Sequence, residues 1–427
     1  MIRFLTILGL LVSLFLLSSA PWASAVAYTL VSILQPQYVW FWSFESIPIF
    51  KITAALAILA WGIELSRGNI NWQVYKTWQF KGIVLIWAWM HLSNFFSPFS
   101  YYYAGIGAEI VLGTMNTIVI MYFIVLGLIN NEKSLKWFAY VLVLVGIYYT
   151  YWANDHYLSN NWSQFKNGRL NGPRGSPYGD GNALSIVLIV CMPFVLFGIQ
   201  HFKQKWLQVL MILSLPLMWH ALILFASRGA LLSAGVLTLF AASLMKSKVL
   251  NKALVLGFLT IIIAQGGALL DRTKNTVSAA QTNSEEPLNP RLVSWKIGAK
   301  LIGKYPIFGA GPQRFQIASA THFPGESPHV AHNTFFNFSA NTGLLTGLVF
   351  ISFFFASFRQ YKKVRDSTEF GSTFHYINRS CAAALLGFFV GAIFLDLIIF
   401  EPFYFLLALI SANYILATEA ETEKVGE

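Results

Sequence analysis

The chain has 427 residues, of which 56% are hydrophobic and only 11% are charged. Soluble globular proteins carry roughly 25% charged residues, so this composition excludes a soluble enzyme or binding module. A formal net charge of +11 would suggest nucleic acid as the partner of a soluble protein. Here most lysines and arginines fall between apolar runs, where they set membrane topology, and we expect no nucleic-acid partner.

Apolar runs of about 17–25 residues, long enough to cross a bilayer, recur along the chain. They predict an all-α, polytopic membrane protein of about twelve transmembrane helices, forming one integral membrane domain over residues 1–427. In residues 1–37 the pattern fits either a broken helix or a shallow hairpin around Pro21. The other predicted apolar segments are 49–66, 83–96, 112–129, 135–152, 183–199, 206–225, 229–245, 251–270, 333–357, 380–397 and 399–418.

The positions of lysine and arginine orient these segments. Cationic residues cluster in alternate connecting segments, which the positive-inside rule assigns to the cytoplasm. The segments left on the outer face are 97–111, 153–182 and 271–332. Segment 271–332 is the longest water-soluble stretch, so the sequence predicts a large outer loop there between transmembrane helices.

The sequence offers no pattern for a metal or a nucleotide cofactor. Cys191 and Cys381 lie in apolar segments and predict neither a disulfide nor a thiolate ligand. His322, His329 and His332 are not spaced as ligands on one helix face, and the nearby acids form no metal-binding motif. Nucleotide-binding fingerprints are missing as well, so we expect no metal and no cofactor.

The first outer-face cluster runs from Arg169 to Asn182, where glycines and prolines predict a shaped turn before a helix. Asp180 and Asn182 are expected to cap that helix. Arg169 and Arg174 lie close together in sequence at the membrane face. They either snorkel to lipid headgroups or bind an anionic ligand, and the sequence leaves both roles open.

The second cluster is Ser227-Arg228-Gly229, between two apolar runs. An arginine at this depth is costly unless it is paired or hydrated, and the local sequence has no carboxylate to pair with it. Arg228 is therefore a candidate phosphate ligand, because a guanidinium binds phosphate through two parallel hydrogen bonds. Pairing with a distant acid, Asp396 or Glu401, is the structural alternative.

Two further clusters lie in and after the long outer loop. Residues 291–304 predict a short amphipathic helix at the membrane interface, with Arg291 near its start as the candidate ligand. The turn Gly309-Ala310-Gly311 predicts a close approach of two backbones. His332-Asn333 lies where the chain returns to the membrane. An imidazole suits general-base work near neutral pH, although a structural hydrogen-bonding role is the alternative.

This ordered set of motifs resembles the bacterial O-antigen ligase and polymerase superfamily. The segment from Ser32 to Trp40 is similar to the O-glycosylation ligase branch found with exosortase systems. Asp180-Gly181-Asn182 departs from the more usual turn of the superfamily. The motifs that carry the resemblance are short, and they are Arg169-x-x-Gly172, Ser227-Arg228-Gly229, Arg291-x-x-x-Trp295, Pro306-x-x-Gly309-x-Gly311 and His332-Asn333.

The resemblance implies a GT-C-like, metal-independent glycosyltransferase, multi-pass in the bacterial inner membrane, with its active site on the periplasmic face. Its donor would be a glycan on undecaprenyl pyrophosphate, transferred with inversion to a hydroxyl of lipid A-core, a glycan or a protein. Arg228 and Arg291 would hold the pyrophosphate, and His332 would take the acceptor proton or orient the hydroxyl. The residues implied to line the donor or acceptor site are Arg169, Arg174 and Asn333.

Three alternatives to a ligase that acts on lipid A-core stay open. An O-antigen polymerase and a protein O-oligosaccharyltransferase would use the same donor chemistry with another acceptor. A transporter for a lipid-linked glycan belongs to a different class of protein. Transporters usually carry inverted repeats and helices broken near the bilayer midplane, whereas the polar residues here crowd one face, which argues against transport.

Overall fold

The computed structural model describes residues 19–44, 47–100, 107–245, 248, 251–260, 262–263, 290–325 and 330–426. Most of these residues are helical, and their β-structure is one hairpin of β1 (Phe165–Lys166) and β2 (Arg169–Leu170). The described part of the chain is thus mainly α, as predicted. The expectation for residues 1–37 lies partly outside the described residues. In the described part of that stretch, α2 (Trp22–Leu34) begins directly after Pro21.

Six helices in the described part of the chain are long and apolar enough to cross a membrane. They establish a multi-pass membrane protein, while the total of twelve spans and the GT-C-like arrangement stay predictions. These helices are α5 (Ile49–Ser66), α7 (Ala108–Leu128), α9 (Gly181–His201), α10 (Lys205–Phe225), α16 (Leu344–Ser367) and α18 (Glu401–Gly426). Other helices are α3 (Pro36–Val39), α4 (Phe41–Phe44), η1 (Trp72–Lys76), α6 (Trp78–Phe95), α8 (Glu132–Leu158), η2 (Trp162–Gln164), α11 (Arg228–Ser243) and α17 (Thr373–Ala392).

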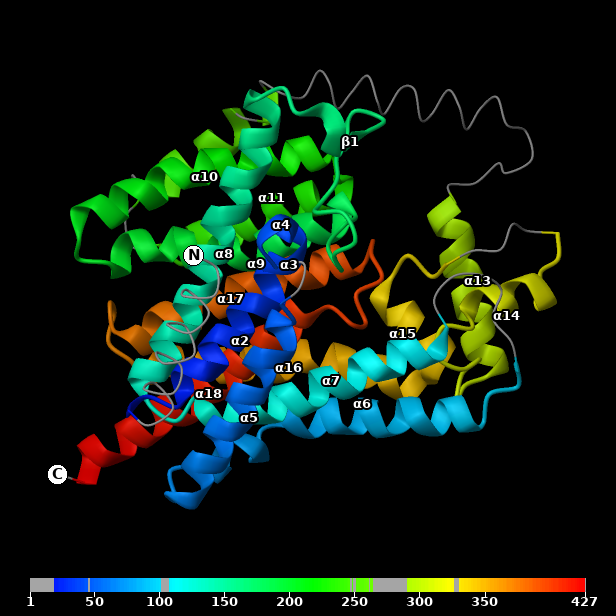
Figure 1. The fold of residues 1–427 in the computed structure, drawn as a ribbon, viewed down its shortest axis with the longest axis horizontal. Helices are drawn as coiled ribbons and strands as arrows, with labels where there is room; N and C mark the ends of the chain where they lie inside the picture. Colours follow the sequence, from blue (N-terminus) through cyan, green and yellow to red (C-terminus); the bar gives the residue numbers. More distant parts are fainter. Residues whose placement is uncertain are drawn as a thin grey trace.

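Helix α9 is the central helix of the bundle. It packs against α8, α10 and α17 (Figure 1), and 83% of its most apolar 18-residue stretch is buried inside the protein. Its sequence is apolar on every side, as expected for a helix that is surrounded by other helices. Helix α5 is the opposite case. Only 22% of its 18-residue apolar stretch is buried, so most of its apolar surface is left for lipid.

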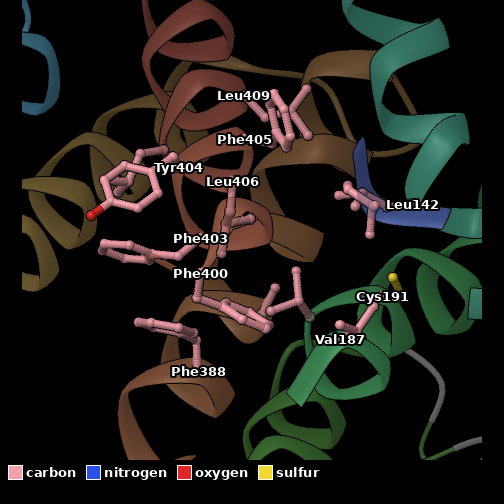
Figure 2. Close-up of a cluster of buried hydrophobic side chains, with 14 of the residues drawn as sticks. Leu142, Val187, Cys191, Phe388, Phe400, Phe403, Tyr404, Phe405, Leu406 and Leu409 are labelled. Carbon is pink, nitrogen blue, oxygen red and sulfur yellow. The ribbon is translucent and has the colours of Figure 1, made fainter. Parts of the chain in front are cut away.

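Stacked aromatic rings hold α17 against α18 (Figure 2). The rings of Phe388 on α17 and Phe403 on α18 lie 4.3 Å apart at an interplanar angle of 9°. The ring of Phe400 lies 6.0 Å from that of Phe388. Phe400 is the last residue of the segment 393–400 that joins the two helices, here called the α17–α18 loop. The stack therefore fixes the end of this loop.

The predicted apolar segments 333–357 and 380–397 are wrong as single helices. The first is divided into α15 (Thr334–Thr342) and α16 by Gly343, whose φ is +94°. The backbone N–H of Leu344 donates to the carbonyl of Pro306 at 2.9 Å, and a Cβ at Gly343 would collide with the carbonyl oxygen of Ile307. The second segment ends at Ala392, where the α17–α18 loop begins.

The described part of the long outer loop is folded. The predicted amphipathic helix is confirmed as α13 (Pro290–Lys304), which buries Ile297 and Leu301 and exposes its lysines. It packs with α14 (Phe315–His322) and α15 around a second apolar cluster. The close approach predicted for the glycine turn is also confirmed, because a Cβ at Gly309 would collide with the backbone of Asn341.

We expect Phe388→Ala to lower the stability of the protein strongly, because it removes the central ring of the stack. Truncation of a buried Phe costs about 3–5 kcal/mol, so the unfolding temperature in detergent should fall by several degrees. The matched control is Phe95→Ala on α6, since the Phe95 side chain is 80% exposed. Equal unfolding temperatures for the two variants would contradict the role given to the stack.

Candidate functional site

The α17–α18 loop is the place where the starts of α11, α13 and α15 meet. A Cβ at Gly229 on α11 would lie 3.0 Å from the Cβ of Phe394, and the Arg291 guanidinium of α13 lies 5.8 Å from the Phe394 ring centroid. The Asn333 side chain, which caps α15, donates to the carbonyl of Ile393 at 3.0 Å. One short loop thus gathers the N-termini of three helices.

Arg228 is the first residue of α11, and its side chain is exposed. The chain makes a sharp turn from α10 into α11 because Ala226 adopts a left-handed φ of +49°. The hydroxyl of Ser227 then accepts a hydrogen bond from the N–H of Ala230 at 3.4 Å and caps α11. Among the described residues, no ion pair joins Arg228 to Asp396 or Glu401, the distant acids suggested as its partners.

Arg291 is the second residue of α13 and is half-buried. Burial lowers the pKa of its guanidinium, and the positive charges of Arg228 and Arg169 lower it further. These charges act on Arg291 because the three side chains approach one another. The structure therefore brings together arginines that lie far apart in the sequence, in a group here called the arginine cluster (Arg169, Arg228 and Arg291).

A β-hairpin turn delivers Arg169 to this cluster. Asn167 and Gly168 both have positive φ values, of 52° and 68°, as in the tight turns that Asn-Gly pairs favour. The Arg169 guanidinium then donates to the carbonyl of Phe225 at 3.3 Å and to Oδ1 of Asn182 at 2.9 Å. Phe225 is the last residue of α10, so Arg169 is tied to the turn that leads into Arg228.

The two residues expected to cap α9 have different roles. Asp180 is the cap, since its carboxylate accepts from the N–H of Asn182 at 3.1 Å. The Asn182 side chain instead lies between Asp180 and Arg169, donating to the carboxylate and accepting from the guanidinium. An amide that is bonded on both sides in this way orients the arginine without neutralising its charge.

The hydrogen-bond partners of Arg174 differ from those of Arg169. Its exposed guanidinium donates to the carbonyl of Ser163 at 2.7 Å. It lines a cavity of about 530 Å³ whose wall also includes Lys166, Asn171 and Gly175. The described contacts therefore place Arg174 at a neighbouring outer cavity and not in the arginine cluster.

His332 precedes the cap of α15 and is half-buried. Its φ of +47° lies in the left-handed region, which is strained for any residue other than glycine. Hydrogen bonds of the next two residues keep His332 in this strained conformation. Asn333 bonds to the α17–α18 loop, and the hydroxyl of Thr334 donates to the carbonyl of Leu395 at 2.8 Å and accepts from the N–H of Leu397 at 3.1 Å.

The loop also carries a carboxyl that the sequence motifs did not single out as a site residue. The Asp396 side chain is exposed to solvent, although protein atoms surround its carboxyl. This desolvation raises the pKa of Asp396 to about 6, although hydrogen bonds from Asn337 and from the backbone of Ile398 oppose the rise. The Asp396 carboxyl therefore loses its proton and becomes negatively charged as the pH rises through about 6, at a position beside the start of α15.

An apolar groove of about 240 Å³ begins at the same place. Asn333 and Ile393 form the end that lies nearest to His332 and the α17–α18 loop, and the rest of the wall comes from Phe335 on α15 and from α16 and α17. Most of the wall is aromatic or aliphatic, with Phe335, Phe350, Phe354, Phe355, Phe389 and Val390 among its residues. The groove can therefore take a hydrocarbon chain whose polar end reaches His332.

Other polar residues of the outer loop have structural contacts. His322, at the end of α14, bonds to Lys304 and to the hydroxyl of Tyr305, at 2.9 Å each. Arg314 is buried and donates to Oδ1 of Asn94 on α6 at 2.8 Å. His329 lies outside the described residues. Within the described part of the chain, no group of three histidines, cysteines or acids is placed to hold a metal ion.

Fold and site together define a multi-pass helical membrane protein with a cationic site where helix N-termini converge. Residues 213–351 match the family model described as O-antigen ligase, and this match confirms the relationship to the O-antigen ligase superfamily that the motifs indicated. The matched range contains Arg228, Arg291 and His332. A search of curated proteins found no match. The family implies a glycosyl-transferring enzyme of the ligase or polymerase type.

Asp396 gives a pH-dependent prediction. Because its folded-state pKa is raised to about 6 from 3.8, the folded protein binds this proton more tightly than the unfolded chain does. Its contribution to stability is present below pH 3.8 and is lost as the pH rises through about 6. Infrared spectra should show a protonated carboxyl band that disappears with a midpoint near pH 6.

We expect Asp396→Asn to abolish this band and Asp366→Asn, which alters an exposed acid on α16, to leave it unchanged. A midpoint near the ordinary aspartate value of about 3.9, or a band that survives Asp396→Asn, would contradict the crowded environment described for this carboxyl.

Proposed function

We propose that the protein transfers a glycan from a lipid-linked pyrophosphate donor to an acceptor hydroxyl, as an O-antigen ligase-type enzyme. The observation that carries the proposal is the arginine cluster at converging helix N-termini beside His332. Each helix N-terminus carries about half a positive charge and donates backbone N–H groups to anions. A pyrophosphate group, with several negative oxygens, matches such a site.

The transfer breaks the bond between the anomeric carbon of the glycan and the pyrophosphate oxygen. The electrons of that bond pass to the pyrophosphate, which leaves with one more negative charge. The acceptor oxygen forms the new bond from the opposite face, so the anomeric configuration inverts. Arg228 and Arg291 stabilise the charge that develops on the leaving group, and Arg169 adds a third guanidinium. These groups are fixed before the reaction, so they need little reorganisation.

We assign to His332 the role of the base that accepts the proton of the acceptor hydroxyl. A base held at hydrogen-bonding distance contributes typically about 10²–10⁴-fold to such a step. The strained backbone at His332 supports this role, because the α17–α18 loop holds the residue in a conformation that few side chains adopt. Orientation of the hydroxyl, without proton transfer, is the alternative role of this imidazole.

The apolar groove on α16 and α17 supports a donor with a lipid chain. Asn333 lies at the end of the groove that adjoins His332, so a lipid seated there would bring its head group to the site. The donor that the resemblance implies is undecaprenyl pyrophosphate, at the periplasmic face of a bacterial inner membrane. Its long isoprenoid tail is a hydrocarbon chain of the kind that the groove accommodates.

The proposed acceptor is a sugar hydroxyl of lipid A-core. A growing glycan, as in a polymerase, or a protein hydroxyl would accept the same donor by the same chemistry. Arg174 is proposed to contact the glycan at the outer cavity, and Asn333 to position the donor head group at the start of the groove. The three acceptors give different products in one assay, so the same experiment separates them.

The test is transfer from purified undecaprenyl-pyrophosphate glycan to lipid A-core in EDTA. We expect Arg291→Ala to lower kcat by about 10²–10³-fold, the usual loss when one donor to a developing negative charge is removed. Arg291→Lys should recover only part of the rate, because an ammonium cannot bind phosphate through two parallel bonds. His332→Ala should lower kcat by about 10²–10⁴-fold.

The matched control for these variants is Lys296→Ala, which removes an exposed cation from the same helix as Arg291. It should keep the activity of the wild type. Longer glycans on the lipid carrier would identify a polymerase, and glycosylation of an added protein would identify a protein acceptor. A folded protein that forms none of these products would refute the proposal and favour a transporter.

The groove gives a separate prediction. Val390→Trp should fill the groove from α17 and raise the apparent KM for the long-chain donor by at least about tenfold, since burial of each CH₂ contributes about 0.8 kcal/mol. A donor with a short, soluble lipid should be used equally well by the variant and the wild type. If both donors are affected alike, the groove does not bind the lipid chain.

A further inference from the structure

A cavity of about 560 Å³, lined by both polar and apolar side chains, lies between α3, α5 and α7. Its volume is within the roughly 300–1,000 Å³ range of sites that bind small molecules. None of these three helices forms a wall of the apolar groove. The side chains that give the cavity its polar character are Gln35, Gln37, Tyr38, Lys51, Thr114 and Glu401.

The amides in this cavity are fixed in place, and one acceptor has no partner. Gln35 adopts a left-handed φ of +53° between α2 and α3, and its side chain donates to the carbonyl of Ser32 at 2.6 Å. The amide of Gln37 donates to Oε1 of Gln35 at 2.6 Å. Oε1 of Gln37 is buried and makes no hydrogen bond within the described part of the chain. A buried polar atom of this kind needs a partner, which a bound ligand would supply.

A carboxylate completes the polar wall. Glu401 is the first residue of α18, and it accepts a hydrogen bond from the hydroxyl of Ser32. Amide groups, a carboxylate and a phenol ring together form the chemistry that recognises sugars. The amides and the carboxylate exchange hydrogen bonds with hydroxyl groups, and the ring of Tyr38 offers a face to the C–H groups of a pyranose.

The neighbouring helix α4 indicates the depth of the cavity in the membrane. Its residues Phe41 and Trp42 are 61% and 65% exposed. Exposed aromatic side chains of this kind mark the boundary between membrane and water. A cavity of mixed lining at this boundary can take a sugar of a membrane-anchored glycan, which offers both hydroxyl and C–H groups, whereas a hydrocarbon chain alone would leave its amides and carboxyl without partners.

The cavity and the apolar groove adjoin opposite ends of the α17–α18 loop. Ile393, the first residue of the loop, lines the groove, and Glu401, which follows its last residue, lines the cavity. Pro177, from the outer segment that also carries Arg169, forms another part of the cavity wall. In the same segment, a Cβ at Gly175 would meet the ring of Tyr38 at 3.3 Å. The arginine cluster contacts the loop between these two ends.

We propose that this cavity binds a glycosyl unit of the acceptor. The inference rests on the proposed function, in which the donor lipid occupies the groove on α16 and α17. The acceptor then approaches from the other end of the loop, and its sugar is held beside the site by Gln37 and Glu401. This arrangement gives donor and acceptor separate sites, as an inverting transfer requires, since the acceptor attacks from the face opposite the leaving group.

A filling substitution with a matched control tests the inference. Gly113 lines the cavity on α7, and no atom lies within 4 Å of the position that its Cβ would occupy. Gly113→Trp therefore adds an indole to the cavity wall at a position where the Cβ meets no neighbouring atom. Gly62 on α5 has the same open surroundings but does not line the cavity, so Gly62→Trp is the control. Glu401→Gln tests the carboxylate with little change of shape.

Two soluble probes separate binding from transfer. One is the oligosaccharide released by mild acid from the lipid-linked donor, and the other is delipidated core oligosaccharide. Binding to the protein in detergent is measured by saturation-transfer NMR. We expect the core oligosaccharide to bind to the wild type and Gly62→Trp, and its affinity to fall at least about tenfold, or 1.4 kcal/mol, in Gly113→Trp and severalfold in Glu401→Gln.

The outcomes are distinct. Loss of core binding in Gly113→Trp, and to a smaller extent in Glu401→Gln, but not in Gly62→Trp, with a higher KM for the acceptor and an unchanged KM for the donor, supports an acceptor site. If only the donor oligosaccharide loses affinity, the cavity binds sugar from the donor and the acceptor assignment is overturned. If neither probe binds, or all variants bind equally, the carbohydrate site is overturned even where transfer proceeds. Sugar binding without any transfer would instead count against the proposed function.

Discussion

The α17–α18 loop can hold the starts of α11, α13 and α15 together because it is fixed along its whole length. The stack of Phe388, Phe400 and Phe403 fixes the end of the loop, and hydrogen bonds from Asn333 and Thr334 fix its beginning and middle. An unrestrained loop of this length would lose the positions of its contacts, and the order of the site would be lost with them. The bundle interior thus determines the geometry of the site.

The site concentrates charges of one sign. Three guanidinium groups approach closely enough to disfavour the protonated form of Arg291, and three helix N-termini add positive potential at the same place. Folding brings them together only because apolar packing elsewhere offsets their repulsion. An anion bound among them would relieve this repulsion. The repulsion among the guanidinium groups therefore both lowers the stability of the empty site and favours the binding of a multivalent anion. A multivalent anion that binds at this site would therefore raise the stability of the folded protein.

Hydropathy predicted most helices of the bundle, because a membrane-spanning helix must be apolar over its full length whatever its neighbours are. It failed at Gly343, where a left-handed backbone conformation and not polarity divides two helices, and at Ala392, where α17 ends although the apolar run continues. The motifs indicated Arg228, Arg291 and His332, since charged groups at a membrane face are conspicuous. They could not indicate that Arg169 joins Arg228 while Arg174 does not. The Asn167-Gly168 pair was the available signal for the hairpin that separates these two arginines. The position of Asp396 depends on packing between helices that are distant in sequence, and a local sequence pattern cannot predict such packing.

Main-chain bonds between residues 306–311 and residues 340–344 help to attach α13 and α14 to the bundle. Glycines permit this close approach, and the hydroxyls of Ser93 and Ser97 donate to the carbonyls of Phe308 and Ala310 at the same junction. Substitutions on the exposed surface of α13 and α14 leave these bonds in place. The exposed surface of α13 and α14 can therefore change without moving the start of α15, where His332 lies.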